Sequence, residues 1–447
     1  MITNHGIHQW NIIPGLPDTG GQNVFVNQFT DSLANEGYKI TVVNRGGYLH
    51  PVSQELHSGL VYKDENRRIL YIEDNTKEFI RKEDMNPQIE TLTANLYDFI
   101  SHEECEINMI ISHYWDGAKI AALLNRKLDN PVKHIWVPHS TGALKKHNVK
   151  PERYKTLRID ERIAAEKEII KEVDYIAYTS YAVKDSLNSD YNYHGGVFLP
   201  PGIETDRFYP KVVADDDEIW NFLSGISGLE AGQIKNCKII TEISRTDTTK
   251  RKNVLIEAFA KVHAKNPDTF LIIAIDDTEQ KLAPELKNLI KTLGIEKYVA
   301  PIGNEWERMP TLYRLSSVYC SPSIMEGFGM SVQEAAASKI PVVTSALVPF
   351  ATEFLAGDSP RKEVYSGDGA TGSITAGAGC IIVKPDETEG FAHAISLIIN
   401  DETLERRMGE QAYSICIPYF TWKSMIKVFL KDIDCSYWKK RAKSIAS

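Results

Sequence analysis

The stretch "SPSIMEGFGMSVQEAAASKIPVVTS", residues 321–345, leads from one predicted strand through a helix to the next strand. The apolar run at its start predicts a strand over 318–321, helical spacing predicts a helix over 333–338, and a second apolar run predicts a strand over 342–344. Short apolar strands joined by a helix are typical of a parallel sheet covered by helices. The stretch therefore indicates an α/β fold.

The same stretch carries two carboxylates, Glu326 and Glu334, separated by seven residues. Its glycines predict a turn, and Ser331 is predicted to be the N-cap of the helix that carries Glu334. Backbone N–H groups at that helix start can meet a phosphate, and carboxylates can accept hydrogen bonds from sugar hydroxyls. Two glutamates are more often solvated surface charges, but apolar runs on both sides argue against a simple solvated face.

Short apolar runs alternate with longer amphipathic runs over the whole chain. The prolines of "LPPGIETDRFYP" (199–210) and the acidic stretch after them interrupt the alternation, and a second series begins at Lys238. The pattern predicts two doubly wound domains of similar size. The predicted domains are 1–205 and 206–420, with a last segment over 421–447. The glycine-rich stretch 357–379 is predicted to be a surface loop.

Strands are predicted over 39–44, 68–72, 107–112, 134–137, 175–178, 196–199, 238–243, 270–275, 299–302, 318–321, 342–344 and 379–383.

The composition is that of a globular protein with room for more than one core. The 447 residues are 43% hydrophobic and 25% charged, and the formal charge of −9 argues against a general nucleic-acid or membrane-surface binder. Six scattered cysteines indicate core residues in a reducing compartment, and no cluster of Asp or His predicts a metal site. No run approaches the roughly 20 apolar residues of a membrane span, so we expect a cytoplasmic protein without membrane insertion.

Two adjacent glycines, Gly20 and Gly21, lie in "GLPDTGGQNVF" (15–25). The apolar residues after them recur at helical spacing, so the glycines open a helix whose positive end favours an anion. Glycine also lets the backbone approach a ligand closely. For these residues alone, a plain strand-to-helix turn is the alternative interpretation.

With these motifs the chain resembles the retaining GT-B glycosyltransferases of family 4, and among them the sucrose-phosphate synthases and their relatives. The resemblance covers nearly the whole chain. It implies two facing Rossmann-like domains, with a C-terminal helix that starts at Trp422 and returns to the first domain. The segments that carry it, besides the stretch with the two glutamates, are "PDTGGQ", "ISHYWDGA", "VPHSTGALKK", "RIAAEKEIIKEVDYIAYTS", "LPPGIETDRF", "EISRTDTTKRKNVLIEAF" and "YFTW".

The resemblance implies three catalytic residues, His139, Arg245 and Glu326. His139 is expected to touch the transferred sugar, and Arg245 with a lysine to neutralise the diphosphate as its bond to the sugar breaks. Lys250 matches the family's lysine by its distance from Arg245, and Lys252 matches it by preceding an asparagine. The implied donor-binding residues are Gly20, Gly21, Gln22, Lys250, Lys252, Gly327, Phe328, Gly329, Met330, Ser331 and Glu334.

On the acceptor side the resemblance implies that Lys145 and Arg162 hold a phosphate. Glu161 departs from the family pattern, because sucrose-phosphate synthases carry an arginine there, and a carboxylate beside a phosphate opposes its binding. His113 and Asp116 are expected either to line the acceptor pocket or to hold its loop.

The implied reaction moves a hexose from a UDP- or GDP-linked sugar to a small, anionic sugar acceptor, with no cofactor required and no metal. A sugar-nucleotide epimerase or phosphorylase of the same fold, and a non-catalytic nucleotide-sugar sensor, are the alternatives. The expected partners are the two small-molecule substrates, and the sequence specifies no oligomeric state.

Overall fold

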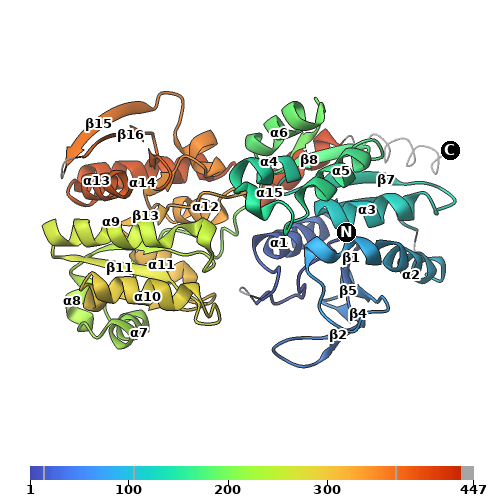
Figure 1. The fold of residues 1–447 in the computed structure, drawn as a ribbon, viewed down its shortest axis with the longest axis horizontal. Helices are drawn as coiled ribbons and strands as arrows, with labels where there is room; N and C mark the ends of the chain where they lie inside the picture. The colour runs from blue at the N-terminus through green and yellow to red at the C-terminus, as the bar shows by residue number, and fades with distance from the viewer. Residues whose placement is uncertain (14–15, 104–105, 368–369, 434–447) are drawn as a thin grey trace. The chain divides into compact units, whose positions relative to one another are not determined.

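The computed structural model describes residues 1–13, 16–103, 106–367 and 370–433, and its chain divides into two compact units (Figure 1). Unit 1 consists of residues 1–202 and the segment that starts at Trp422, and unit 2 is Ile203–Thr421. The first unit boundary follows residue 202, where the sequence predicted 205. The second follows residue 421, where the sequence predicted 420.

A mostly parallel sheet forms the centre of unit 1, because apolar strands alternate with helices that cover both of its faces. Ile2 bridges Val43 and Ser112 in parallel and so joins the two halves of the sheet. An antiparallel strand is added at one edge, and a short hairpin lies beside it. The strands of the sheet are, in spatial order, β4 (Gly59–Tyr62), β5 (Arg67–Ile72), β1 (Ile40–Arg45), β6 (Met109–His113), β7 (Lys133–Val137), β8 (Tyr175–Tyr178) and β9 (Val197–Phe198), and the hairpin is β2 (Tyr48–Leu49) with β3 (Leu56–His57).

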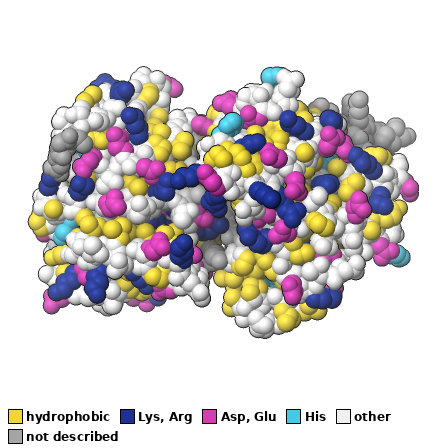
Figure 2. Space-filling model, in the orientation of Figure 1, with side chains coloured by type: hydrophobic (Ala, Val, Ile, Leu, Met, Phe, Trp, Pro, Cys, Tyr) yellow, Lys and Arg dark blue, Asp and Glu magenta, His cyan; other side chains and the backbone are white. Residues whose placement is uncertain are grey.

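Hydrophobic side chains are exposed on the part of unit 1 that carries this hairpin and β4 (Figure 2). They are Leu49, Val52, Leu56, Val61 and Tyr62.

An eight-stranded sheet forms unit 2. Its first six strands are parallel, and two antiparallel strands complete it at one edge. The spatial order is β12 (Val299–Ile302), β11 (Thr269–Ala274), β10 (Lys238–Glu242), β13 (Val318–Ser321), β14 (Val342–Ser345), β17 (Cys380–Val383), β16 (Ala370–Ala376) and β15 (Arg361–Gly367).

Helices connect the strands in both units (Figure 1). Those of unit 1 are α1 (Gly21–Asn35), α2 (Ile89–Ser101), α3 (Tyr114–Asn125), α4 (Gly142–Asn148), α5 (Ile159–Ile169), α6 (Tyr181–Tyr191) and α15 (Trp422–Asp432), with short 3₁₀ turns η1 (Lys82–Asp84), η2 (Asn86–Gln88) and η3 (Pro151–Arg153). Those of unit 2 are α7 (Glu218–Ser227), α8 (Ala231–Lys235), α9 (Lys252–Lys265), α10 (Leu282–Thr292), α11 (Met309–Leu315), α12 (Met330–Ala337), α13 (Thr388–Ile399) and α14 (Glu402–Cys416), with the 3₁₀ turns η4 (Thr248–Lys250) and η5 (Glu296–Tyr298) and the π-helical turn η6 (Ala351–Leu355).

All twelve predicted strands are present in the structure, with ends that differ by two residues or fewer. The predicted surface loop over 357–379 is wrong, because β15 and β16 form an antiparallel hairpin there. Tyr365 and Ile374, one on each strand of the hairpin, are buried, and Tyr365 stacks on His393 of α13 at 5.0 Å. The pairing of the two strands with each other and of β16 with β17 holds this polar stretch as strands.

The helix α15 packs within unit 1, as the resemblance implied. Trp422 stacks on Phe29 of α1 at a ring distance of 6.0 Å, and its indole N–H donates to Gln28 at 3.0 Å. Phe429, about two turns after Trp422 in α15, contacts Phe29 edge-on. These rings bury the hydrophobic face of α1, so unit 1 is built from two pieces of chain that are distant in sequence.

No helix among the described residues is long and apolar enough to cross a membrane. Cys320, Cys380 and Cys416 are buried and Cys237 is half-buried, all with free thiols. Cys105 and Cys435 lie outside the described residues.

Candidate active site

The glycine loop of unit 1 begins α1, as the sequence predicted. Gly20 is the N-cap of α1, and its N–H donates to the side chain of Asn23 at 3.0 Å. The N-terminal segment supports the loop, because Ile7 N–H donates to Thr19 Oγ1 at 2.9 Å and Gln22 donates to Thr3 at 3.0 Å. These contacts fix the loop against the N-terminal segment, and the N-terminus of a helix favours an anion.

His139 follows β7 and adopts a left-handed backbone conformation with φ of 56°. Its Nε2 lies 3.1 Å from Nδ1 of His113, and the edge of Phe25 packs on its ring at 5.0 Å. Burial lowers the pKa of His139 to about 3. The side chain is therefore neutral over the working pH range, which suits a hydrogen-bonding contact to a sugar and not a general acid.

His113 and Asp116 both contact other parts of the site. Asp116, in the first turn of α3, pairs with Nδ1 of His5 at 3.0 Å, and the other carboxylate oxygen of Asp116 is buried without a partner. His113 is fully buried beside His139. His113 therefore contacts His139 directly, and Asp116 pairs with His5, which the sequence analysis did not identify.

Arg162 is buried in α5, and each of its three guanidinium nitrogens donates a hydrogen bond within the chain. Its guanidinium donates to Glu166 at 2.7 Å, to the phenol of Tyr114 at 2.6 Å and to the carbonyl of Ser140, the residue after His139. Glu166 in turn accepts the backbone N–H of Gly142 at 2.8 Å. Burial alone would lower the pKa of Arg162, but the charges of Tyr114 and Glu166 outweigh it and raise that pKa. Arg162 thus braces the loop that carries His139.

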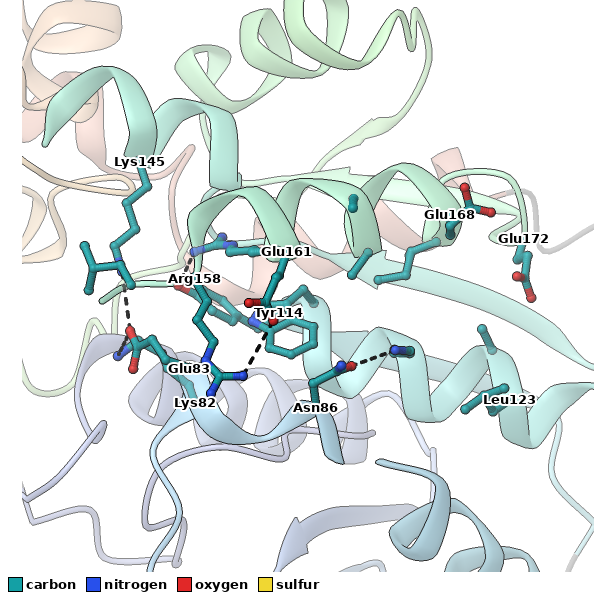
Figure 3. Close-up of a pocket in the computed structure, with 18 of the residues that line it drawn as sticks. Lys82, Glu83, Asn86, Tyr114, Leu123, Lys145, Arg158, Glu161, Glu168 and Glu172 are labelled. Atoms are coloured by element: carbon teal, nitrogen blue, oxygen red, sulfur yellow. Dashed lines mark hydrogen bonds and ion pairs between the residues drawn. The ribbon is translucent and has the colours of Figure 1, made fainter. Parts of the chain in front are cut away.

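A cavity of about 540 Å³ lies between α3, α5 and η1, and Arg162 and Tyr114 form part of its wall (Figure 3). Lys145 of α4 reaches into it toward Glu83, with Lys82 beside them (Figure 3). The ammonium of Lys145 lies 3.7 Å from Glu83, too far for a hydrogen bond. Burial, joined by the charges of Arg162 and Lys82, lowers the pKa of Lys145.

Lys82 connects this cavity to the glycine loop. Its ammonium pairs with the carboxylate of Asp18, and its backbone N–H donates to the same carboxylate at 3.0 Å. Asp18 immediately precedes Thr19 and Gly20, so the polar end of the cavity touches the loop that opens α1. The sequence analysis missed Lys82 and Glu83, because no local pattern distinguishes the "RKED" segment from a solvated turn.

In unit 2 the neighbouring lysines Lys250 and Lys252 form ion pairs with different carboxylates. Lys250 pairs with Glu326, and both side chains retain some exposure. Lys252 pairs with Glu242 and donates to the hydroxyl of Ser244 at 3.0 Å, and its side chain is 1% exposed. Of the two ammonium groups, only that of Lys250 is placed beside a residue predicted to bind the donor.

Arg245 is exposed after β10, in the loop that also carries Asp247. Burial alone would raise the pKa of Asp247, but hydrogen bonds from Thr249 and the charges of Arg245 and Lys250 outweigh it and leave that pKa lowered. The charges of Arg245 and Lys250 therefore both reach this short loop. A diphosphate bound beside the loop could form charge-assisted hydrogen bonds with the two side chains.

The helix that carries Glu334 has its N-cap two residues earlier than predicted. Gly329, and not Ser331, is the N-cap of α12, with φ of 105°. A Cβ on Gly329 would lie 2.6 Å from Val348, so the chain turns where only glycine fits. Met330 is the first residue of the helix, and Ser331 is in its first turn.

Glu334 is buried and accepts a hydrogen bond from the phenol of Tyr313 at 2.8 Å. Burial raises the pKa of Glu334 to about 7, although the Tyr313 hydrogen bond and the charge of Arg207 oppose this shift. Phe328, before Gly329, packs on Phe350 at 5.2 Å and anchors the turn. The predicted donor residues of this stretch are thus brought together at one helix start.

Comparisons with known proteins place this chain in a family. The model described as glycosyl transferases group 1 matches residues 230–415, and that described as glycosyltransferase family 4 matches residues 19–207. The chain belongs to the family 4 glycosyltransferases. It is therefore an enzyme of a family of retaining hexosyltransferases that use nucleotide-sugar donors.

Relatives of similar length support this assignment. A mannosylfructose-phosphate synthase of Agrobacterium fabrum is 29% identical over 77% of this chain and 75% of its own. A D-inositol 3-phosphate glycosyltransferase of Corynebacterium aurimucosum is 24% identical over 92% of this chain and 89% of its own. The sucrose-phosphate synthase structure from Thermosynechococcus elongatus matches with a TM-score of 0.74 and 20% identity over 100% of this chain and 99% of its own, which shows the shared GT-B fold.

Proposed function

We propose that this family 4 glycosyltransferase transfers glucose or mannose from a UDP- or GDP-linked sugar to a small sugar acceptor that carries a phosphate or carboxylate. The observation that carries the proposal is the ammonium of Lys145. It lies in a cavity beside the glycine loop and makes no hydrogen bond with the described residues. Lys145 is partly buried, and its ammonium lies 3.7 Å from Glu83, so a hydrogen-bonded anion would improve its contacts.

Unit 2 supports the donor half of the proposal. Lys250 pairs with Glu326, Arg245 lies in the loop before Lys250, and Glu334 lies in α12. A diphosphate bound there gains charge-assisted hydrogen bonds as its bond to the sugar breaks. Lys252 cannot serve in the same way without breaking a buried ion pair, so we assign the diphosphate contact to Lys250.

The proposed reaction keeps the anomeric configuration. The bond between the sugar C1 and the diphosphate oxygen breaks, and a bond from C1 to the acceptor oxygen forms on the same face. The acceptor proton passes to the leaving diphosphate. Neutral His139 holds the transferred sugar, and Arg245 and Lys250 stabilise the charge that develops on the diphosphate.

The acceptor is tested by screening sugar phosphates and their neutral forms against nucleotide sugars, with released UDP or GDP as the readout. We expect at least a tenfold preference in kcat/KM for the phosphorylated form, since a charge-assisted contact contributes about 1.5–3 kcal/mol. Lys145→Ala should remove the preference. Lys146→Ala is the matched control, because its ammonium pairs with Asp160 on the surface. Equal use of the neutral acceptor by the wild-type enzyme contradicts the proposal.

The donor is tested by Arg245→Ala and Glu326→Ala. Each should lower kcat by about 10² or more, because Arg245→Ala loses a contact to the leaving diphosphate and Glu326→Ala loses a contact to the transferred sugar. Release of nucleotide without a new glycoside would favour an epimerase or phosphorylase, and nucleotide-sugar binding without turnover would favour a sensor.

A further inference from the structure

Glu83 is a buried carboxylate with an unused oxygen, and it lines the same cavity as Lys145 (Figure 3). The residue is 8% exposed, and its Oε2 is buried without a hydrogen-bond partner. Its Oε1 lies 3.7 Å from Lys145 and 3.8 Å from Lys82, and its Oε2 lies 3.6 Å from the guanidinium of Arg81, all beyond hydrogen-bond distance. A buried carboxylate in this state costs free energy unless a donor reaches it.

The unused groups of Glu83 and Lys145 are complementary to one kind of molecule. The ammonium needs acceptors, which a phosphate supplies, and the carboxylate needs donors, which hydroxyl groups supply. An anion without hydroxyl groups would accept hydrogen bonds from Lys145, but its negative charge would repel the negative charge of Glu83. A polyhydroxylated anion satisfies both.

The nearby charges strengthen this selection. Lys82 is already paired with Asp18, and Arg162 is paired with Glu166. Lys145 and Arg81 have no carboxylate partner other than Glu83 among the described residues. The side chain of Arg81 is 61% exposed, so water screens its charge, and the charge of Glu83 acts mainly on Lys145. The polar end of the cavity is close to neutral, so an anion gains little there from charge alone.

We propose that Glu83 accepts a hydrogen bond from a hydroxyl group of the acceptor and makes the enzyme select a sugar or cyclitol phosphate over simple phosphate anions. This inference rests on the proposed function and names the acceptor class for the same site. Glu83 is a specificity-determining residue in this role, because it touches the acceptor next to the group that Lys145 holds.

Calorimetry and inhibition kinetics with Glu83→Gln test the proposal, with fructose 6-phosphate, D-inositol 3-phosphate and inorganic phosphate as probes. The affinity for the better of the two hydroxylated phosphates should fall about tenfold or more, because a hydrogen bond to a charged group is lost. Inorganic phosphate should bind or inhibit more tightly, since the opposing charge is gone. Opposite shifts for the two classes of probe are the signature that a purely structural role would not produce.

Asp160→Asn is the matched control, because it removes an exposed carboxylate whose partner, Lys146, does not line the cavity. It should leave both affinities unchanged. Glu83→Asp keeps the charge but shortens the side chain, so it should weaken the hydroxylated phosphate while inorganic phosphate stays as in the wild type. This second variant serves if Glu83→Gln fails to fold.

Loss of affinity for all three probes alike, or no change for any of them, overturns the role of Glu83. Failure of the proposed function is a different result, in which the wild-type enzyme transfers sugar only to neutral acceptors. The binding measurements remain readable in that case, because they need no turnover.

Discussion

Lys250 and Lys252 lie two residues apart, and their spacing in the sequence fits the same role. Burial separates them, because Lys252 faces Glu242 inside the unit and Lys250 faces Glu326. Lys145 and Lys146 differ in the same way: the first points into the cavity and the second pairs with Asp160 on the surface. For each pair of neighbouring lysines, the direction in which the side chain points from the backbone therefore decides whether its ammonium can meet a ligand.

We predict that Arg162 supports activity by holding the loop that carries His139, and not by contacting the acceptor. Arg162→Ala should lower the free energy of unfolding by about 3–5 kcal/mol, because it leaves Glu166 buried without its partner. Chemical denaturation measures the change. Arg158→Ala, at a half-exposed site, should cost less than about 1 kcal/mol. If Arg162→Ala keeps full stability and raises only KM for a phosphorylated acceptor, then Arg162 contacts the acceptor directly.

Glu334 is predicted to couple nucleotide binding to pH. With a pKa of about 7 it holds a proton below that pH in the free enzyme, whereas hydroxyl donors from a ligand favour the ionised form. Binding of UDP or GDP should therefore release a proton below pH 7, and affinity should rise with pH, by up to about tenfold per unit, and level off above pH 7. Calorimetry in buffers of different ionisation enthalpy measures the release. Glu334→Gln should abolish it, and equal proton release in that variant would assign the titration to another group.

At the scale of the element, the start of α12 determines how the donor residues are presented. The sequence pattern favoured Ser331 as the N-cap because serine is a common cap. The chain instead turns at Gly329, where Val348 leaves no room for a side chain. Met330 and Ser331 therefore belong to the first turn of α12, whereas the sequence pattern predicted that Ser331 precedes the helix as its N-cap.

Gly329→Ala should displace this turn. The new methyl group would meet Val348 in a left-handed conformation that side chains disfavour, so we expect a loss of about 1–3 kcal/mol in unfolding free energy and weaker binding of nucleotide. Gly225→Ala in α7 is the control, since nothing lies within 4 Å of its added methyl group. It should keep or raise the melting temperature. Unchanged nucleotide affinity in Gly329→Ala would show that the α12 start does not contact the donor.

At the scale of the whole molecule, unit 1 is completed by a helix from the far end of the chain. Trp422 is 6% exposed against the rings of Phe25 and Phe29. The glycine loop and α1 are therefore supported by a residue some four hundred positions away in the sequence. Neither piece of unit 1 buries this face alone.

Trp422→Ala should destabilise unit 1 selectively. We expect a loss of about 3–5 kcal/mol, as for other buried tryptophans, with faster amide exchange in α1 and α15 and unchanged exchange in the strands of unit 2. Hydrogen exchange read by mass spectrometry resolves the two units. Tyr419→Ala, at a site that is 65% exposed, is the control and should change neither. Equal loss of protection in both units would mean that they unfold together.

The sequence by itself determined the local features of this protein. Short apolar runs in the sequence predicted the twelve strands, and paired glycines marked the start of α1, because both signals depend on residues that are close in the chain. The same signals failed over 357–379, where a polar composition hides a hairpin that pairs with β17. Strand pairing is a long-range interaction, and composition does not report it.

Only the tertiary structure decided which side chains share a site. Lys82 meets Asp18, Glu83 meets Lys145 and His5 meets Asp116, each across more than sixty residues of chain. No periodicity encodes these distances, because they follow from how strands and helices stack. The sequence therefore located the loops at the ends of the strands, and packing selected the charges that those loops bring together.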